Sequence, residues 1–117
     1  MPEQFFKRDY IHGATNADTD WEKEHLFCQR RCLVGSVAVA NKGADFWLWI
    51  CDSPSCGAQK PTMAPIYVPG NTTQSLDWSL LPKKFSAGLY VCASTNPVTK
   101  TAPVTNDAFF EAAYELY

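Results

Sequence analysis

The 117-residue sequence has neither a long hydrophobic run nor an excess of charge of one sign. Its longest uninterrupted apolar stretch, Phe46–Cys51, is far shorter than the roughly 18 residues of a membrane span. The N-terminus, with Lys7 and Arg8, lacks the apolar segment of a secretory signal, so we expect a protein made and kept inside a cell. A formal net charge of -2 makes neither nucleic acid nor an anionic membrane the expected partner.

Histidines are scarce and reactive motifs are missing. His12 and His25 are the two histidines, and both lie in the charged N-terminal part of the chain. There is no Gly-x-Ser-x-Gly, no phosphate-binding glycine loop and no His-Glu-x-x-His. The later part of the chain offers only isolated carboxylates at Asp45, Asp52, Asp77 and Asp107. We therefore predict a protein that is not an enzyme, with no catalytic residues and no cofactor.

Five cysteines could build a metal site or disulfides. His25, Cys28, Cys32, Cys51 and Cys56 would be the zinc ligands, but this spacing departs from that of structural zinc sites. If the chain is extended, Cys28 and Cys32 lie ~13 Å apart, too far for one ion or for a disulfide. A Cys51–Cys56 disulfide is geometrically easier, but an odd cysteine count without an export signal favours thiols. We predict no metal, and Cys92 as a small core residue.

Half of the charged side chains lie in the first 31 residues. We therefore divide the chain into an N-terminal arm, residues 1–27, and a β-sandwich domain, residues 28–117. Residues 20–29 fit a helix capped by Thr19 and fit extended chain equally well. Large apolar residues are spaced along the arm, and burying them against a partner would offset the entropy cost of ordering it. The predicted partner-binding residues are Phe5, Phe6, Tyr10, Ile11 and Trp21.

From Cys32 onward the sequence is typical of strands and turns. In an extended segment, one face holds Leu33, Gly35, Val37 and Val39, and the other holds Ser36, Ala38 and Ala40, which predicts a strand with its first face covered. Asn41–Ala44 follows as a predicted hairpin turn. Phe46–Cys51 is apolar throughout, which predicts a central strand buried on both faces. Pro65 confines the segment 62–68 to an edge or an interrupted strand.

Three further segments alternate between apolar and polar residues. Leu76, Trp78 and Leu80 are predicted to share a core face, as are Leu89, Val91 and Ala93. The segment 107–117 fits a helical stripe as well, but alternation favours a strand with Phe110, Ala112, Tyr114 and Leu116 inward. Short strands with frequent turns predict an all-β fold, an antiparallel β-sandwich of the jelly-roll or immunoglobulin-like type with a charged N-terminal arm.

The four tryptophans leave a carbohydrate-binding module open as an alternative function. Exposed rings stack on sugars, but Trp47 and Trp49 sit in the fully apolar segment, and Trp78 lies in phase with Leu76. Core positions are therefore the favoured interpretation for these rings. A zinc-stabilised interaction module is a further alternative.

Several motifs occur together in the second half of the chain. They are Val68-Pro-Gly-Asn-Thr-Thr-Gln-Ser-Leu-Asp-Trp78, Phe85-x-x-Gly-Leu-Tyr-Val-Cys-Ala-Ser-Thr95, Thr99-Lys-Thr101 and Asp107-x-Phe-Phe-x-x-x-Tyr114, with Asp52 ending an earlier strand. From Cys32 to Tyr117 this set resembles a family of small tailed-bacteriophage virion structural proteins with a β-sandwich fold.

The resemblance implies a non-enzymatic virion protein that is synthesised in the host bacterial cytoplasm. Within the virion, the preferred role is a capsid decoration or cement subunit, otherwise a neck or tail component. The expected partners are other virion proteins, such as the major capsid protein or neck and tail proteins, and further copies of this chain. Neither nucleic acid nor a membrane is an expected partner.

Overall fold

The computed structural model describes residues 11–14, 21–55, 57, 60–78 and 80–116 and contains two antiparallel β-sheets. The first sheet has the strand order β1-β9-β3-β6, with β7 also pairing with β3. The second sheet has the order β2-β8-β4-β5. The strands are β1 (Ile11–Ala14), β2 (Glu24–Cys28), β3 (Cys32–Asn41), β4 (Phe46–Cys51), β5 (Ile66–Val68), β6 (Thr72–Asp77), β7 (Lys83–Phe85), β8 (Leu89–Ser94) and β9 (Ala108–Leu116).

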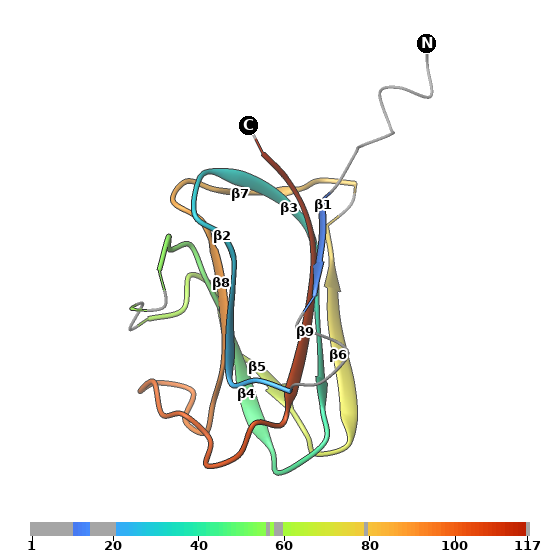
Figure 1. Ribbon diagram of the computed structural model, residues 1–117, viewed down its shortest axis with the longest axis vertical. Helices are drawn as coiled ribbons and strands as arrows, with labels where there is room; N and C mark the ends of the chain where they lie inside the picture. Colours follow the sequence, from blue (N-terminus) through green and yellow to red (C-terminus); the bar gives the residue numbers. More distant parts are fainter. Residues whose placement is uncertain (1–10, 15–20, 56, 58–59, 79, 117) are drawn as a thin grey trace.

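The strands pair in a nested order. β1 pairs with β9, β2 with β8, β3 with β6 and β4 with β5, all antiparallel. A long hairpin that is rolled up so that its two arms stay paired gives this order, which is that of a jelly roll. The two sheets face each other across the core (Figure 1). The predicted antiparallel sandwich is confirmed, and the pairing selects the jelly-roll type over the immunoglobulin-like type.

The main core lies between the sheets. β4 places Phe46, Leu48 and Ile50 there, and β8 places Leu89 and Val91 there. Each of these side chains is at most 2% exposed, so each contributes about 1.5–3 kcal/mol to folding relative to an exposed position. Both segments lie between two other strands of their sheet, so the predicted central, doubly buried strand at Phe46–Cys51 is confirmed.

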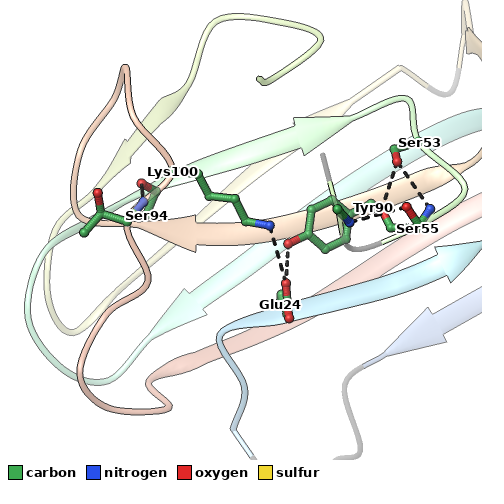
Figure 2. A network of polar contacts seen from close by, with 8 residues as sticks. Glu24, Ser53, Ser55, Tyr90, Ser94 and Lys100 are labelled. Carbon is green, nitrogen blue, oxygen red and sulfur yellow. Dashed lines mark hydrogen bonds and ion pairs between the residues drawn. The ribbon is translucent and has the colours of Figure 1, made fainter. Parts of the chain in front are cut away.

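A second apolar layer covers the opposite face of the β2-β8-β4-β5 sheet. It contains the buried side chains Trp49, Cys51, Tyr90 and Cys92. Lys100, in the loop after β8, contacts this layer (Figure 2). Its ammonium lies 4.8 Å from the centre of the Tyr90 ring and 3.8 Å from the Glu24 carboxylate. The Tyr90 hydroxyl donates a hydrogen bond to the same carboxylate. The predicted core position of Cys92 is confirmed.

A β-bulge corrects the predicted faces of β3. The pairing of β3 with β9 shifts register between Val34 and Ser36. The extra residue reverses the phase of alternation, so Val34 is buried on the same strand as Val37 and Val39 while Leu33 is only half-buried. The prediction that Leu33 shares a buried face with Val37 was therefore wrong.

The turn at Asn41–Ala44 is also corrected. It joins β3 to β4, which belong to different sheets, so it forms a corner between the sheets and no hairpin. The Asn41 side chain stabilises this corner, because its amide donates to the carbonyls of Ala44 at 2.8 Å and Val68 at 3.1 Å. Its Oδ1 accepts the Gly43 N–H at 2.9 Å.

Two other strand predictions are confirmed, one of them with an exception. β5 is short and lies at a sheet edge, as Pro65 predicted. The last segment is the strand β9, with Phe110, Ala112 and Tyr114 buried. Leu116, the last residue of β9, is the exception, because it is 39% exposed although it was predicted to point inward.

Hydrogen bonds to Asp52 link the end of β4 to the turn that precedes β8. Its carboxylate accepts backbone N–H groups of Ser86 at 2.9 Å, Ala87 at 2.7 Å and Gly88 at 3.2 Å. Gly88 is required here by close approach: a Cβ on it would lie 2.3 Å from the carbonyl oxygen of Cys28. These contacts explain why an aspartate directly follows β4 and a glycine directly precedes β8.

Two segments of the predicted arm, residues 1–27, pair with strands of the sandwich. β1 pairs with β9 over its whole length, and β2 pairs with β8 and crosses the predicted boundary. Between them, Glu22 forms a β-bridge with Ala108. Of the two conformations that fitted residues 20–29, the extended one is observed over Glu24–Cys28.

Candidate interaction surface

Within the described part of the chain, no three His, Cys, Asp or Glu side chains lie close enough together to hold a metal ion. The His25 ring lies 3.0 Å from the Glu22 carboxylate and 4.5 Å, between ring centroids, from Phe27. Both side chains are about a quarter exposed, and His25 belongs to the edge strand β2. Over the same residues, no helix is long and apolar enough to cross a membrane.

An exposed apolar group lies beside a hollow, in the segment between β6 and β7. Leu80 is 95% exposed and Leu81 is 82% exposed. With Trp78, Asp77 and Lys83 they line a hollow of about 420 Å³, which we call the Trp78 hollow. Exposing two adjacent leucines is unfavourable in water, so this surface is a candidate contact with another molecule.

Local hydrogen bonds explain why these leucines point outward. The backbone N–H of Trp78 donates to the Gly35 carbonyl at 2.6 Å, which continues the contact of β6 with β3. The N–H of Leu81 then donates to the Trp78 carbonyl at 3.0 Å, which closes a turn. The chain therefore leaves the sheet after Asp77, and the prediction that Leu80 continues the core face of Leu76 and Trp78 was wrong.

A second hollow of about 310 Å³ opens between the two sheets. Phe27, Cys28, Gln29, Arg30, Tyr114 and Leu116 line it, and we call it the Tyr114 hollow. The Tyr114 hydroxyl donates to the Phe27 carbonyl at 2.9 Å, which links β9 to β2 across the sandwich. Burial raises the pKa of this tyrosine above its ordinary value, so the hydroxyl stays protonated at neutral pH.

The segments that line the two hollows lie at the same end of the sandwich, where β7 crosses and β9 ends (Figure 1). The same segments carry three exposed cations: Arg30 after β2, and Lys83 and Lys84 in β7. The Lys83 ammonium lies 5.9 Å from the Trp78 ring. This end, defined by the two hollows and called the β7 end below, combines exposed apolar surface with cations and with the exposed carboxylate of Asp77. Such a surface suits a protein partner with an apolar centre and polar margins.

Of the predicted partner-binding residues, Ile11 and Trp21 belong to the described chain. Phe5, Phe6 and Tyr10 are outside the described residues. Ile11 belongs to β1, where its backbone pairs with Tyr114. Trp21 is half-buried against Phe109 of the same chain, with ring centroids 5.7 Å apart. The structure therefore brings Trp21 onto the sandwich, and a role for these residues in partner binding stays a prediction.

The tryptophans considered for sugar binding have different positions. Trp49 is completely buried and has no face for a ligand. Trp47 is half-buried, and its ring lies 5.2 Å from that of Tyr67, whose hydroxyl donates to Asp45 at 2.5 Å. Trp78 lines the hollow beside Leu80. Only Trp47 and Trp78 of these three have surface for stacking.

Sequence reasoning missed Leu80 and Leu81 as surface residues. Alternation through Leu76, Trp78 and Leu80 favoured a single strand, but β6 ends at Asp77. Two adjacent leucines break the alternation, and Pro82 follows them directly. Adjacent leucines followed by a proline predict a turn, and this pattern could have placed both leucines outside the strand.

The comparisons support the fold. No family model matches the sequence, and no curated protein matches it. A solved structure of the Tobacco streak virus coat protein has a similar fold: the TM-score is 0.50 with 10% sequence identity, over 91% of this chain and 85% of that chain. A structure of the Tobacco streak virus coat protein dimer gives a TM-score of 0.46 with 10% identity, over 95% of this chain and 89% of the other.

Proposed function

We propose that this chain is a non-enzymatic structural subunit of a virion that binds neighbouring subunits through the β7 end. The observation that carries the proposal is the exposure of Leu80 and Leu81 beside the Trp78 hollow. On a rigid sandwich such a surface is stabilised by a protein partner, because association removes it from water.

The fold supports the same proposal. Jelly rolls are common in viral capsid domains, and the similar solved structure is a viral coat protein. The motifs from Val68 to Tyr114 resemble those of tailed-bacteriophage virion proteins. These supports are independent, since one rests on strand pairing and the other on sequence.

Within a virion, we propose a capsid decoration subunit of a tailed bacteriophage, with a neck or tail component as the second choice. The rigid sandwich can bind repeatedly on a lattice, and the β7 end offers the contact. The partners would be the major capsid protein and further copies of this chain. Residues 1–27 are proposed to assist assembly.

The position in the particle is tested by quantitative mass spectrometry of density-purified particles. A copy number comparable to that of the major capsid protein is expected for a decoration subunit, and one close to that of the portal protein indicates the neck or tail. Absence of this chain from particles would overturn the virion proposal.

The proposed contact is tested by the double substitution Leu80→Asp with Leu81→Asp. The matched control is Val104→Asp, because Val104 is also 95% exposed but lies in the loop before β9, at the opposite end of the sandwich (Figure 1). The double variant should fold normally and fail to enter particles, whereas the control should enter them. Normal incorporation of the double variant would refute the β7 end as the contact.

The arm is tested by deleting residues 1–10. Deletion of all of residues 1–27 would remove β1 and most of β2 and would disrupt the sandwich. The shorter deletion keeps both strands, so failed incorporation with normal folding is the expected result. Normal incorporation would exclude residues 1–10 from assembly.

A further inference from the structure

Cys28 and Cys32 flank the short segment in which the chain passes from one sheet to the other. Cys28 ends β2 and Cys32 begins β3, and only residues 29–31 lie between them. The expectation of a ~13 Å separation assumed a straight strand. The chain reverses instead, and both side chains pack in the same core cluster, with Cys28 near enough to Cys32 to raise its pKa, which corrects that expectation. The Cys28 thiol also donates to the Arg30 carbonyl at 3.1 Å, which holds its sulfur at this corner.

The two thiols differ in their exposure to solvent. Cys28 lines the Tyr114 hollow, whose volume of about 310 Å³ admits the sulfur-bearing end of a small disulfide. Cys28 is 6% exposed, whereas Cys32 is completely buried behind it. One sulfur can therefore meet a reagent from solution, and the other can meet only its neighbour.

We propose that Cys28 and Cys32 form a redox modification site, in which a low-molecular-weight disulfide such as oxidised glutathione converts the two thiols into an intramolecular disulfide. The product joins β2 of one sheet to β3 of the other. The proposal does not depend on the virion assignment, because it rests on the corner, the hollow and the two thiols alone.

The reaction has two exchange steps. The Cys28 thiol loses its proton to water, and its thiolate attacks one sulfur of oxidised glutathione; the glutathione S–S bond breaks, and one glutathione thiolate leaves. The Cys32 thiolate then attacks the Cys28 sulfur and displaces the second glutathione. In total, two protein thiols are oxidised to one disulfide, and oxidised glutathione is reduced to two glutathione thiols.

The second step should be slow and pH-dependent. Burial, followed by the neighbouring Cys28 thiol and the Asp52 carboxylate, raises the pKa of Cys32 to about 12. Tyr114 is a further titratable group near the pair, and burial, followed by Cys28 and Cys32, raises its pKa above the ordinary value of 10.0. Below pH 12 the thiolate fraction of Cys32 rises about tenfold per pH unit, and the closing rate should rise similarly.

The other described thiol pair provides an internal comparison. Cys51 and Cys92 lie on neighbouring strands, but Cys51 pairs with Tyr90 and Cys92 pairs with Trp49. The two cysteines are therefore diagonal neighbours, with Cα atoms about 7–8 Å apart, which exceeds the span of a disulfide. Both side chains are at most 1% exposed. This pair should not react under the same conditions.

The test uses the full chain carrying Cys56→Ser, since Cys56 lies outside the described residues. The folded protein is incubated with oxidised glutathione, quenched with a thiol-alkylating reagent and digested for peptide mapping by mass spectrometry. A Cys28–Cys32 disulfide is expected, with Cys51 and Cys92 recovered as thiols. In the added variant Cys32→Ser, a stable glutathione adduct should accumulate on Cys28, because the second thiol is missing.

Three results would overturn the proposal. They are no loss of the Cys28 thiol, a glutathione adduct on Cys28 that persists although Cys32 is present, and a disulfide that involves Cys51 or Cys92. Circular dichroism of each variant before the reaction verifies that the sandwich is intact. Cys51→Ser serves as the matched control and should leave the rate of Cys28–Cys32 closure unchanged within twofold.

Discussion

Removing the Asp52 carboxylate should destabilise the sandwich more than removing any surface carboxylate. This group accepts three backbone N–H groups, from Ser86, Ala87 and Gly88, over 2.7–3.2 Å. A hydrogen bond to a charged group contributes about 1.5–3 kcal/mol when buried, and partial exposure of the turn lowers this to about 1 kcal/mol each. Asp52→Ala should therefore lower the free energy of unfolding by about 3 kcal/mol.

The variant Asp52→Asn separates hydrogen bonding from side-chain volume. Its amide keeps one oxygen, which can still accept from Ala87 and Gly88, whereas its nitrogen would face the Ser86 N–H. The free energy of unfolding should fall by about 1–2 kcal/mol, which is less than the fall expected for Asp52→Ala. In both variants the backbone N–H of residue 52 can still donate to the Thr62 hydroxyl, a bond of 2.6 Å in the wild type.

Urea denaturation followed by tryptophan fluorescence measures the effect. With a slope of about 1.5 kcal/mol/M, a loss of 3 kcal/mol moves the midpoint down by about 2 M. The control is Glu111→Gln, at an exposed position on β9, which should change stability by less than about 0.5 kcal/mol. A loss below about 1 kcal/mol in Asp52→Ala, or an equal loss in Glu111→Gln, would refute the proposed role of Asp52.

Three further results are expected. Gly88→Ala should destabilise by at least about 2–3 kcal/mol in thermal unfolding, because its Cβ would overlap the Cys28 carbonyl at 2.3 Å; wild-type stability would contradict this geometry. The Tyr67 hydroxyl and the Gly70 N–H lower the pKa of Asp45, so the stability that this carboxylate contributes is present above its ordinary pKa of 3.8 and lost as pH falls through the lowered value. Tyr67→Phe should raise the Asp45 pKa measured by NMR titration, and an unchanged value would refute the contact. Burial raises the pKa of Cys51 to about 12, so in the folded protein at pH 8 this thiol should resist iodoacetamide, with rapid alkylation as the contrary result.

Local patterns in the sequence were sufficient to predict the fold class. Alternation and β-branched or aromatic residues predicted β4, β8 and β9 as strands, and Pro65 predicted a short edge strand at β5. These signals depend on residues that are close together in the sequence. They arise because each strand of a β-sandwich must bury one of its faces. Such local signals do not specify which strand pairs with which.

Tertiary structure decided what the candidate sites are. The bulge in β3 moved Leu33 off the core face, and the end of β6 at Asp77 exposed Leu80. The passage of the chain between the sheets brought Cys28 against Cys32, although a straight strand would separate them. Each of these outcomes depends on hydrogen bonds between segments distant in sequence, such as that from Trp78 to Gly35. The sequence by itself thus determined that a β-sandwich forms, whereas its jelly-roll pairing, its exposed leucines and its paired thiols follow from non-local contacts that alternation does not encode.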